Sequence, residues 1–237
     1  MSVPWFSAFL SAFSVGLLAF GLPVPAADTG RGFHRMLAGG SLAFAAFAVL
    51  TRPLAATAPA VTACVWLGAC AFASALAGSR AGRVSAAFAL IPGCVALAAA
   101  VRFESWIAGA SLFASAAMLG TVFDTMVLGH WYLVKRGMPF SHFRRMNLLF
   151  AAAIGARALA LGAEALFVTQ VYRGSLEDRL VFTLRVAVGV AGPAALAWMA
   201  GRCIRLRSNQ SATGLLYVAC VFVLIGEMAS TWSLRNL

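Results

Sequence analysis

Charged residues are scarce in this 237-residue chain. They make up 11% of the sequence, and only 7 of them are acidic, whereas a soluble domain carries about 25% charged residues because its surface must face water. Hydrophobic residues account for 62%, and the mean hydropathy is +0.90. This shortage of charge excludes a soluble domain of useful size and predicts a chain that is solvated by lipid.

Several catalytic and metal-binding motifs are missing as well. The sequence has no Walker A motif, no GxGxxG motif opening a βαβ unit, no HExxH motif and no nucleophile elbow, which argues against a soluble type of enzyme. It also lacks CxxC and any Cys/His zinc spacing. We therefore interpret the cysteines as small packing residues of apolar segments: Cys64, Cys70, Cys94, Cys203 and Cys220.

Long apolar runs, separated by charge, glycine or proline, predict the fold. They indicate an all-α integral membrane protein of about eight transmembrane helices, arranged as two four-helix groups. The first run lacks the basic start of a signal peptide and is expected to remain as a helix. The expected helices cover 4–25, 36–51, 54–77, 84–101, 105–133, 146–170, 180–203 and 212–232. The second and fourth runs are short, so seven crossings remain an alternative.

The net charge of +11 is explained by orientation rather than by nucleic acid, because the basic residues occupy short loops. One side of the predicted membrane holds 11 of the 18 basic residues: Arg31, Arg35, Arg80, Arg83, Lys135, Arg136, Arg144, Arg145, Arg202, Arg205 and Arg207. The other side holds Arg52, Arg102, Arg173, Arg179 and Arg235. Cytoplasmic loops retain positive charge, so we expect a bacterial inner-membrane protein with both termini outside.

The two halves of the chain differ in their intramembrane charge. Residues 1–103 have span interiors without charge and are rich in small residues, which predicts a packing scaffold. Residues 104–237 carry every charge placed inside a span, and we expect function there. These charges are Asp124, Arg157, Glu164, Arg185 and Glu227.

Depth along the membrane suggests how the five charges pair. Asp124 is placed about 14 Å and Arg157 about 16 Å from the cytoplasmic ends of their spans, which predicts an ion pair between them. Glu164, Arg185 and Glu227 are expected to form one cluster nearer the outside. Gly189 and Gly192 would let a neighbouring helix approach the Arg185 face. These charges are either structural pairs or the lining of a proton or ion path.

An aromatic segment at the inner end of span five is the second candidate site. His130, followed by Trp131 and Tyr132, is placed to contact a quinone carbonyl. It is also placed to ligate the iron of haem b, with His34, His142 or Met146 as the second ligand. A plain interfacial anchor is the alternative that requires no cofactor. No metal site other than haem iron is predicted.

The basic loop before span eight is the third candidate site. Ser211 is expected to cap the helix, and with Arg205 and Arg207 it predicts an anion site at the cytoplasmic face. Anionic lipid headgroups are the expected ligand. The partners predicted for the chain are therefore the lipid bilayer and other membrane subunits, without nucleic acid.

Three functions follow from these features. The leading hypothesis is a quinone- or haem-associated subunit of an electron-transfer assembly, because an eight-helix architecture is similar to that of membrane subunits of bacterial respiratory oxidoreductases. That likeness concerns architecture alone and no diagnostic residue. The alternatives are a transporter of an ion, proton or small solute that uses the buried charges, and a membrane scaffold without catalysis. The sequence leaves open whether the protein is an enzyme.

Overall fold

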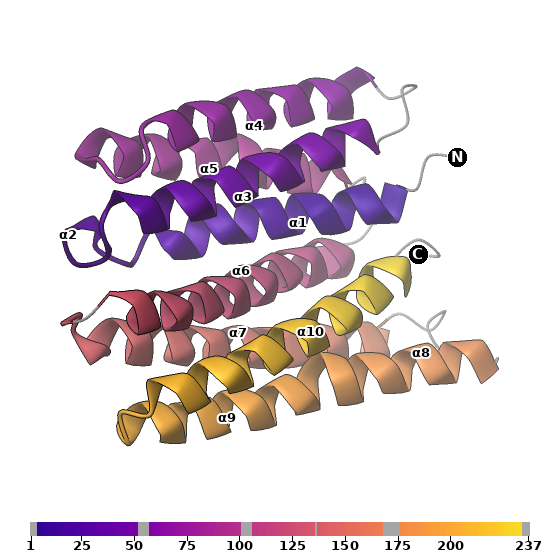
Figure 1. Ribbon diagram of the computed structural model, residues 1–237. Coiled ribbons are helices and arrows are strands. Elements are labelled where there is room, and N and C mark those ends of the chain that lie inside the picture. Colours follow the sequence, from indigo (N-terminus) through magenta and orange to yellow (C-terminus); the bar gives the residue numbers. More distant parts are fainter. Residues whose placement is uncertain (1–3, 52–56, 101–105, 136, 168–175, 234–237) are drawn as a thin grey trace.

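The computed structural model describes residues 4–51, 57–100, 106–135, 137–167 and 176–233. Every regular element in these ranges is a helix. In chain order they are α1 (Pro4–Gly21), α2 (Ala26–Thr29), α3 (Arg31–Leu50), α4 (Thr57–Ala75), α5 (Arg80–Ala100), α6 (Trp106–Val134), α7 (Phe140–Phe167), α8 (Leu176–Val186), a π-helical turn (Ala187–Ala191), α9 (Gly192–Arg205) and α10 (Asn209–Ser233). The segments from α8 to α9 run on without a break as one rod (Figure 1).

Six of these helices are long and apolar enough to cross a membrane: α3, α5, α6, α7, the α8–α9 rod and α10. This agrees with the predicted multi-pass helical membrane protein. α1 and α4 are apolar but shorter over the residues described, so the count of eight crossings stays a prediction. The two runs that are short in sequence, 36–51 and 84–101, lie in full-length helices, because α3 already begins at Arg31 and α5 at Arg80.

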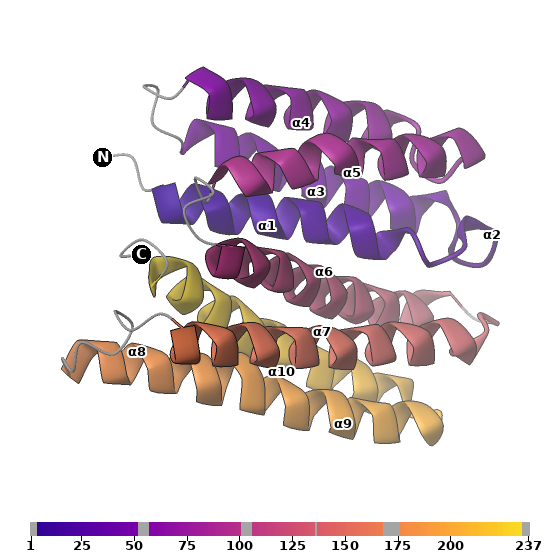
Figure 2. The same ribbon diagram turned by 180° about the vertical axis from the view of Figure 1, so that it is seen from behind.

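The rods lie side by side, with α1 and α6 next to each other in the middle of the bundle (Figure 1, Figure 2). α1 contacts α3 and α5, and α4 packs against both of these helices. On the other side α6 contacts α7 and α10, and α9 packs against these two. The functional division between residues 103 and 104 stays a prediction.

Each end of the bundle has its own set of chain segments (Figure 1). α1 begins and α10 ends at the same end. α2, the turn between α6 and α7, and the turn between α9 and α10 lie at the opposite end, which we call the basic end because it carries most of the described arginines of the loops. Of the residues used to orient the chain, Arg52, Arg102, Arg136, Arg173 and Arg235 lie outside the described part.

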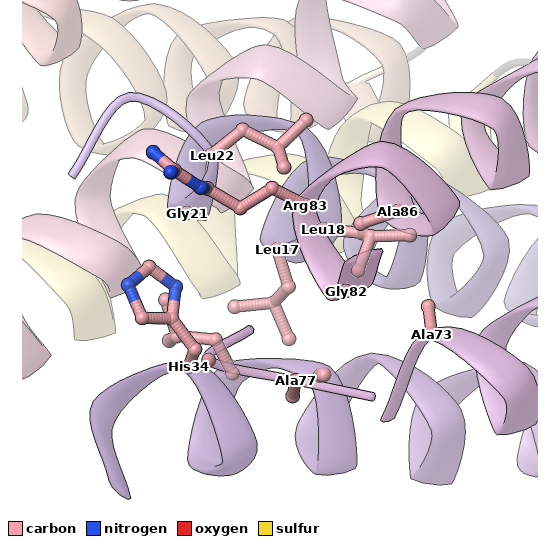
Figure 3. A pocket seen from close by; sticks show the side chains of 13 residues that line it. Leu17, Leu18, Gly21, Leu22, His34, Ala73, Ala77, Gly82, Arg83 and Ala86 are labelled. Carbon is pink, nitrogen blue, oxygen red and sulfur yellow. The ribbon is translucent and has the colours of Figure 1, made fainter. Parts of the chain in front are cut away.

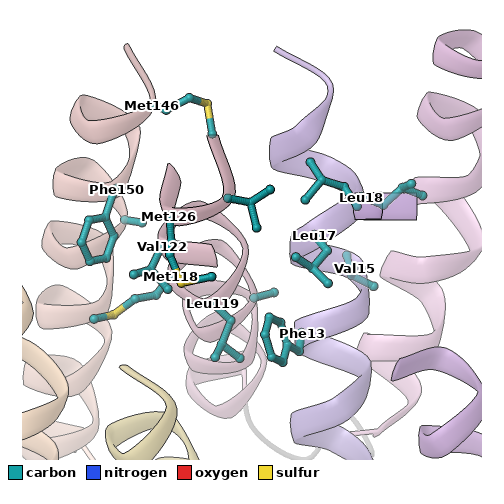
Figure 4. Close-up of a cluster of buried hydrophobic side chains, with 14 of the residues drawn as sticks. Phe13, Val15, Leu17, Leu18, Met118, Leu119, Val122, Met126, Met146 and Phe150 are labelled. Carbon is teal, nitrogen blue, oxygen red and sulfur yellow. The ribbon is translucent and has the colours of Figure 1, made fainter. Parts of the chain in front are cut away.

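The seam between α1 and α6 depends on two glycines. A Cβ added to Gly16 would lie 2.1 Å from the carbonyl oxygen of Ala116, and one added to Gly120 would lie 2.3 Å from Gly16 O. The backbones therefore touch, which small residues permit in membrane proteins. Large apolar side chains, including Phe13 and Leu119, fill the space on either side of this contact (Figure 4).

Hydroxyl groups tie the helices of the first four spans together. Ser14 Oγ donates to Ser41 O over 2.7 Å, and Ser41 Oγ donates to Ser14 O over 2.8 Å, so α1 and α3 are bonded reciprocally. Trp66 of α4 donates from Nε1 to Ser14 Oγ over 3.2 Å. Its ring lies against Gly93 of α5, where a Cβ would meet it at 2.8 Å. The half without buried charges thus has its own polar network.

The cysteines serve as packing residues only in part. Cys70 and Cys220 are buried as expected, whereas Cys203 is half-buried and Cys94 is exposed on its helix. The Cys64 side chain lies outside the described part.

The short helix α2 was not predicted from sequence, and three side chains hold it at the basic end. Trp131 Nε1 donates to Thr29 O over 2.9 Å, and Lys135 Nζ donates to Asp28 O over 2.5 Å. His142 Nε2 lies 2.7 Å from Asp28 Oδ2. The end of α6 and the start of α7 therefore clamp the connection between α1 and α3.

Candidate functional site: a buried charge cluster

Four charged side chains from three rods meet inside the bundle. Arg157 and Glu164 lie two turns apart on α7 and therefore share one face. Arg185 comes from the last turn of α8, and Glu227 comes from α10. Each of the four residues is only 1% exposed. We call them the charge cluster.

Glu227 stands at the centre of one half of the cluster. Arg157 Nε donates to Glu227 Oε1 over 2.8 Å and to Oε2 over 3.2 Å. Two serines of α6 complete this half, because Arg157 Nη1 donates to Ser111 Oγ over 2.8 Å and Ser115 Oγ donates to Glu227 Oε2. The guanidinium thus joins α6, α7 and α10.

Glu164 bridges the two arginines. Arg185 Nη2 donates to Glu164 Oε2, while Glu164 Oε1 lies 3.7 Å from Arg157 Nη1. Arg185 Nε also donates to Ser230 Oγ of α10 over 3.0 Å, and its Nη1 reaches Ser233 Oγ at 3.4 Å. The cluster is continuous from Ser111 to Ser233, and its two guanidiniums and two carboxylates balance in charge.

Two polar atoms of the cluster are left over. Arg157 Nη2 and Glu164 Oε1 are buried and have no hydrogen-bond partner in the part of the chain described. Buried polar groups are normally bonded, because an unmade bond costs about 1–3 kcal/mol. The cluster therefore retains one donor and one acceptor for a further small group, such as a water molecule or an ion.

Glu164, Arg185 and Glu227 come together in one cluster as predicted, and Arg157 belongs to it as well. Their position toward the outside stays a prediction. The small residues beside Arg185 act as expected. A Cβ on Gly226 would lie 2.2 Å from Gly189 Cα, and one on Gly192 would lie 2.4 Å from Phe222 Cδ2. α10 can therefore lie directly against the π-helical turn.

The predicted ion pair between Asp124 and Arg157 is wrong. Asp124 is fully buried, yet neither of its carboxylate oxygens has a hydrogen-bond partner among the described residues. Its Oδ2 would lie 3.8 Å from a Cβ on Gly21, so Asp124 faces α1. Ser115, which faces the cluster, precedes it by nine residues, or about 900° of helix, which places the two on opposite faces of α6.

The start of α7 explains the error in depth. The predicted span began at residue 146, but α7 begins at Phe140. Arg157 therefore lies seventeen residues, or about 26 Å, from the basic end, whereas Asp124 lies ten residues, or about 15 Å, from the end of α6.

His130, Trp131 and Tyr132 do not converge on one site. The His130 side chain is exposed, whereas Trp131 Nε1 bonds to Thr29 O and the Tyr132 hydroxyl bonds to Pro139 O. Successive helical residues point about 100° apart, which explains the divergence. Their role in binding quinone or haem stays a prediction.

The three residues considered as second haem ligands lie in different surroundings. His34 Nε2 lies 3.5 Å from Thr29 Oγ1 and its ring lines a cavity of about 30 Å³ between α1, α3, α4 and α5, with Arg83 opposite (Figure 3). His142 bonds to Asp28, and Met146 is buried in the core. No group of three or more His, Cys, Asp or Glu side chains is placed to hold a metal ion in the described ranges.

Sequence reasoning missed the serines of the cluster. Ser111 and Ser115 are four residues apart on α6, a spacing that places both on one helix face. Both are fully buried. Paired hydroxyls at this spacing inside an apolar helix are the signal that would have pointed to a polar partner on a neighbouring helix.

Comparison of the chain with models of protein families, with curated proteins and with solved structures gave no match. The site is therefore interpreted from its residues and their geometry.

Proposed function

We propose that the protein is a transporter of a proton or another small ion, and that the charge cluster is the polar element of the path. The observation that carries this proposal is the union of Arg157, Glu164, Arg185 and Glu227 in one enclosed network across membrane-length helices. Ionisable residues at this depth are rare in membrane proteins and typically mark ion or proton pathways.

The cost of the cluster supports a role beyond packing. Each charge in a transmembrane helix costs about 2.5–3.5 kcal/mol on the insertion scale. Replacing buried ion pairs with apolar residues of similar volume is often neutral or stabilising. If the four side chains served only to pack the helices, apolar residues of similar volume would do so at a lower cost in free energy.

The bridging position of Glu164 suggests how the path works. Its two oxygens face different arginines, and Oε1 has no hydrogen bond although Arg157 Nη1 lies 3.7 Å away. A proton or cation that binds to Glu164 or Glu227 would weaken the ion pair between that carboxylate and its arginine. The network thus has at least two arrangements that differ in which carboxylate each guanidinium holds, and ion binding shifts the balance between them.

The electron-transfer hypothesis receives less support from the geometry. It depends on His130, whose exposed side chain lies at the basic end without an enclosing pocket from Trp131 and Tyr132. Such a histidine suits contact with a second subunit better than enclosure of a cofactor within this chain. An optical spectrum of the purified protein separates the two hypotheses, because haem or a bound quinone absorbs and an ion path does not.

The orientation belongs to the same proposal. Arginines and the single lysine, Lys135, concentrate at the basic end, and cytoplasmic loops are the ones that retain positive charge. We therefore place the basic end in the cytoplasm of a bacterium and both termini outside the inner membrane. Accessibility of a tag at Gly137 from the cytoplasm, and of terminal tags from outside, tests this placement.

Ion flux into proteoliposomes tests the function. The purified protein is reconstituted with a pH-sensitive dye inside, and a proton or potassium gradient is applied. We expect flux above that of protein-free vesicles, and we expect Glu227→Gln and Glu164→Gln to abolish it. Glu177→Gln is the matched control, because Glu177 is exposed at the start of α8. Flux equal to that of empty vesicles for every ion tested would leave the scaffold alternative and overturn the proposal.

A further inference from the structure

A groove at the basic end lies between the first turns of α7 and the last turn of α9. Its volume of about 440 Å³ falls in the range of small-ligand sites, about 300–1,000 Å³. Basic side chains form one part of its lining, namely Arg144, Arg145, Arg205 and Arg207. Phe140, Ser141, Leu148 and Ile204 form the rest.

In the described part of the chain, no acidic side chain lines the groove beside the four arginines. The sequence holds 7 acidic residues, and three of them, Asp124, Glu164 and Glu227, are buried inside the bundle. Glu177 and Asp178 belong to the start of α8, at the end where the termini lie. Glu104 precedes α6 and lies outside the described part. Asp28 is at the basic end but is held by His142.

One of the groove arginines has an aromatic neighbour. The Arg207 guanidinium lies 6.0 Å from the centroid of the Phe140 ring, and its backbone has a φ of 58°, in the left-handed region. Serine and backbone donors add to the positive groups, because α7 begins at Phe140 and the first N–H groups of a helix lack intrahelical acceptors. The groove therefore offers several donors to one anion.

The position of α10 changes the site expected from sequence. α10 begins at Asn209, so Ser211 is not its cap, and the Ser208 hydroxyl donates to Ser211 Oγ over 2.9 Å instead. Arg205 and Arg207 line the groove together with the first turns of α7. The groove thus lies between α7 and α9.

We propose that this groove binds the phosphate group of an anionic phospholipid, with Arg144, Arg145, Arg205 and Arg207 around the phosphate and the acyl chains along Leu148. Arginine suits phosphate because its planar fork donates two parallel hydrogen bonds. Leu148 is 59% exposed on α7, next to the groove and within a membrane-length helix. A soluble phosphate would use the arginines but not this apolar wall, so a lipid matches the groove better.

Lipid-dependent stability tests the proposal. The delipidated protein is placed in nanodiscs of phosphatidylcholine, with or without phosphatidylglycerol, and thermal unfolding and lipid binding by native mass spectrometry are measured. We expect phosphatidylglycerol to raise the melting temperature and to remain bound. Arg144→Gln and Arg205→Gln should each weaken its binding about fivefold, since one arginine near anionic lipid contributes about 1 kcal/mol.

A matched arginine serves as the control. Arg202 is an exposed arginine on α9 whose guanidinium lies over Trp198, and it does not line the groove. Arg202→Gln should bind phosphatidylglycerol as the unaltered protein does. An equal loss in all three variants would mean general surface attraction and would overturn the site. Stabilisation by inorganic phosphate in phosphatidylcholine nanodiscs, with no effect of phosphatidylglycerol, would overturn the lipid as its occupant.

Discussion

Arg157 of α7 and Glu227 of α10 are joined by a hydrogen bond of 2.8 Å between Nε and Oε1. They are 70 positions apart in the chain, and each side chain is at most 2% exposed. Removal of either residue leaves the buried cluster with an unequal number of guanidiniums and carboxylates. Substitution of either residue therefore tests how much this bond stabilises the packing of α7 against α10.

Breaking this pair from one side should destabilise the protein strongly. Arg157→Ala and Glu227→Ala are each expected to lower the free energy of unfolding by about 3–5 kcal/mol, because each leaves one uncompensated charge in the buried cluster. The double variant should lose much less than the sum of the two. Reversible unfolding in detergent micelles, analysed as a double-mutant cycle, gives the coupling energy.

The same cycle on Asp124 and Arg157 is the control. These two buried residues lie on opposite sides of α6, and no hydrogen bond or ion pair joins them in the described structure. Their effects should therefore add within about 0.5 kcal/mol. Strong coupling between Asp124 and Arg157, with additivity between Arg157 and Glu227, would contradict the arrangement of the charge cluster.

Asp124 should destabilise the folded protein. Its carboxylate oxygens are buried and have no hydrogen bond to any described residue. Asp124→Leu, which has a similar branched shape, is therefore expected to raise the free energy of unfolding by about 1–3 kcal/mol. Glu177→Leu, at an exposed position, should change it by less than about 0.5 kcal/mol. A loss of stability in Asp124→Leu would show that the carboxyl has a bonding partner. Loss of ion flux in a stable Asp124→Asn variant would place Asp124 on the transport path.

The contact of α1 with α6 should tolerate no side chain at Gly16. A methyl group there would lie 2.1 Å from Ala116 O, on a backbone that cannot move aside without separating the helices. Gly16→Ala is therefore expected to cost about 1–3 kcal/mol or more. Gly109→Ala on α6 is the control, because nothing lies within 4 Å of its Cβ position. It should be neutral or stabilising by about 0.5–1 kcal/mol.

Three neighbouring residues at the end of α6 should respond differently to substitution. His130→Ala is expected to leave the melting temperature unchanged, because the side chain is exposed. Trp131→Phe and Tyr132→Phe should each lose about 1 kcal/mol, since each removes a hydrogen bond to a backbone carbonyl. Loss of a bound haem or quinone from a stable His130→Ala protein would favour the electron-transfer hypothesis over the ion path.

Hydropathy located the helices well because a membrane span needs a long apolar run. The expected 212–232 and the observed Asn209–Ser233 differ by three residues at most. The ends of the helices were harder to predict, because a helix can continue through polar residues such as Arg144 and Arg145 as readily as it can end at them. That is why α7 begins six residues before the predicted span.

The candidate site was predictable in composition but not in pairing. Glu164, Arg185 and Glu227 were grouped correctly because they lie near one end of their spans. Asp124 was paired wrongly because depth alone says nothing about which face of α6 a side chain occupies. That information lies in the partners of α6, which approach it from opposite sides: α1 meets Asp124, and α7 meets Ser111. The sequence of a single helix does not contain it.

The π-helical turn next to Arg185 sets the rotation of α8 relative to α9 within the α8–α9 rod. Its bond runs from Gly192 N–H to Ala187 O, five residues back, and so spans one residue more than the bond of an α turn. Each residue turns a helix by about 100°. An uninterrupted α-helix in this place would present α8 rotated by about that angle relative to α9, with Arg185 turned away from Glu164. The extra residue of the π-helical turn therefore sets the phase at which Arg185 meets Glu164.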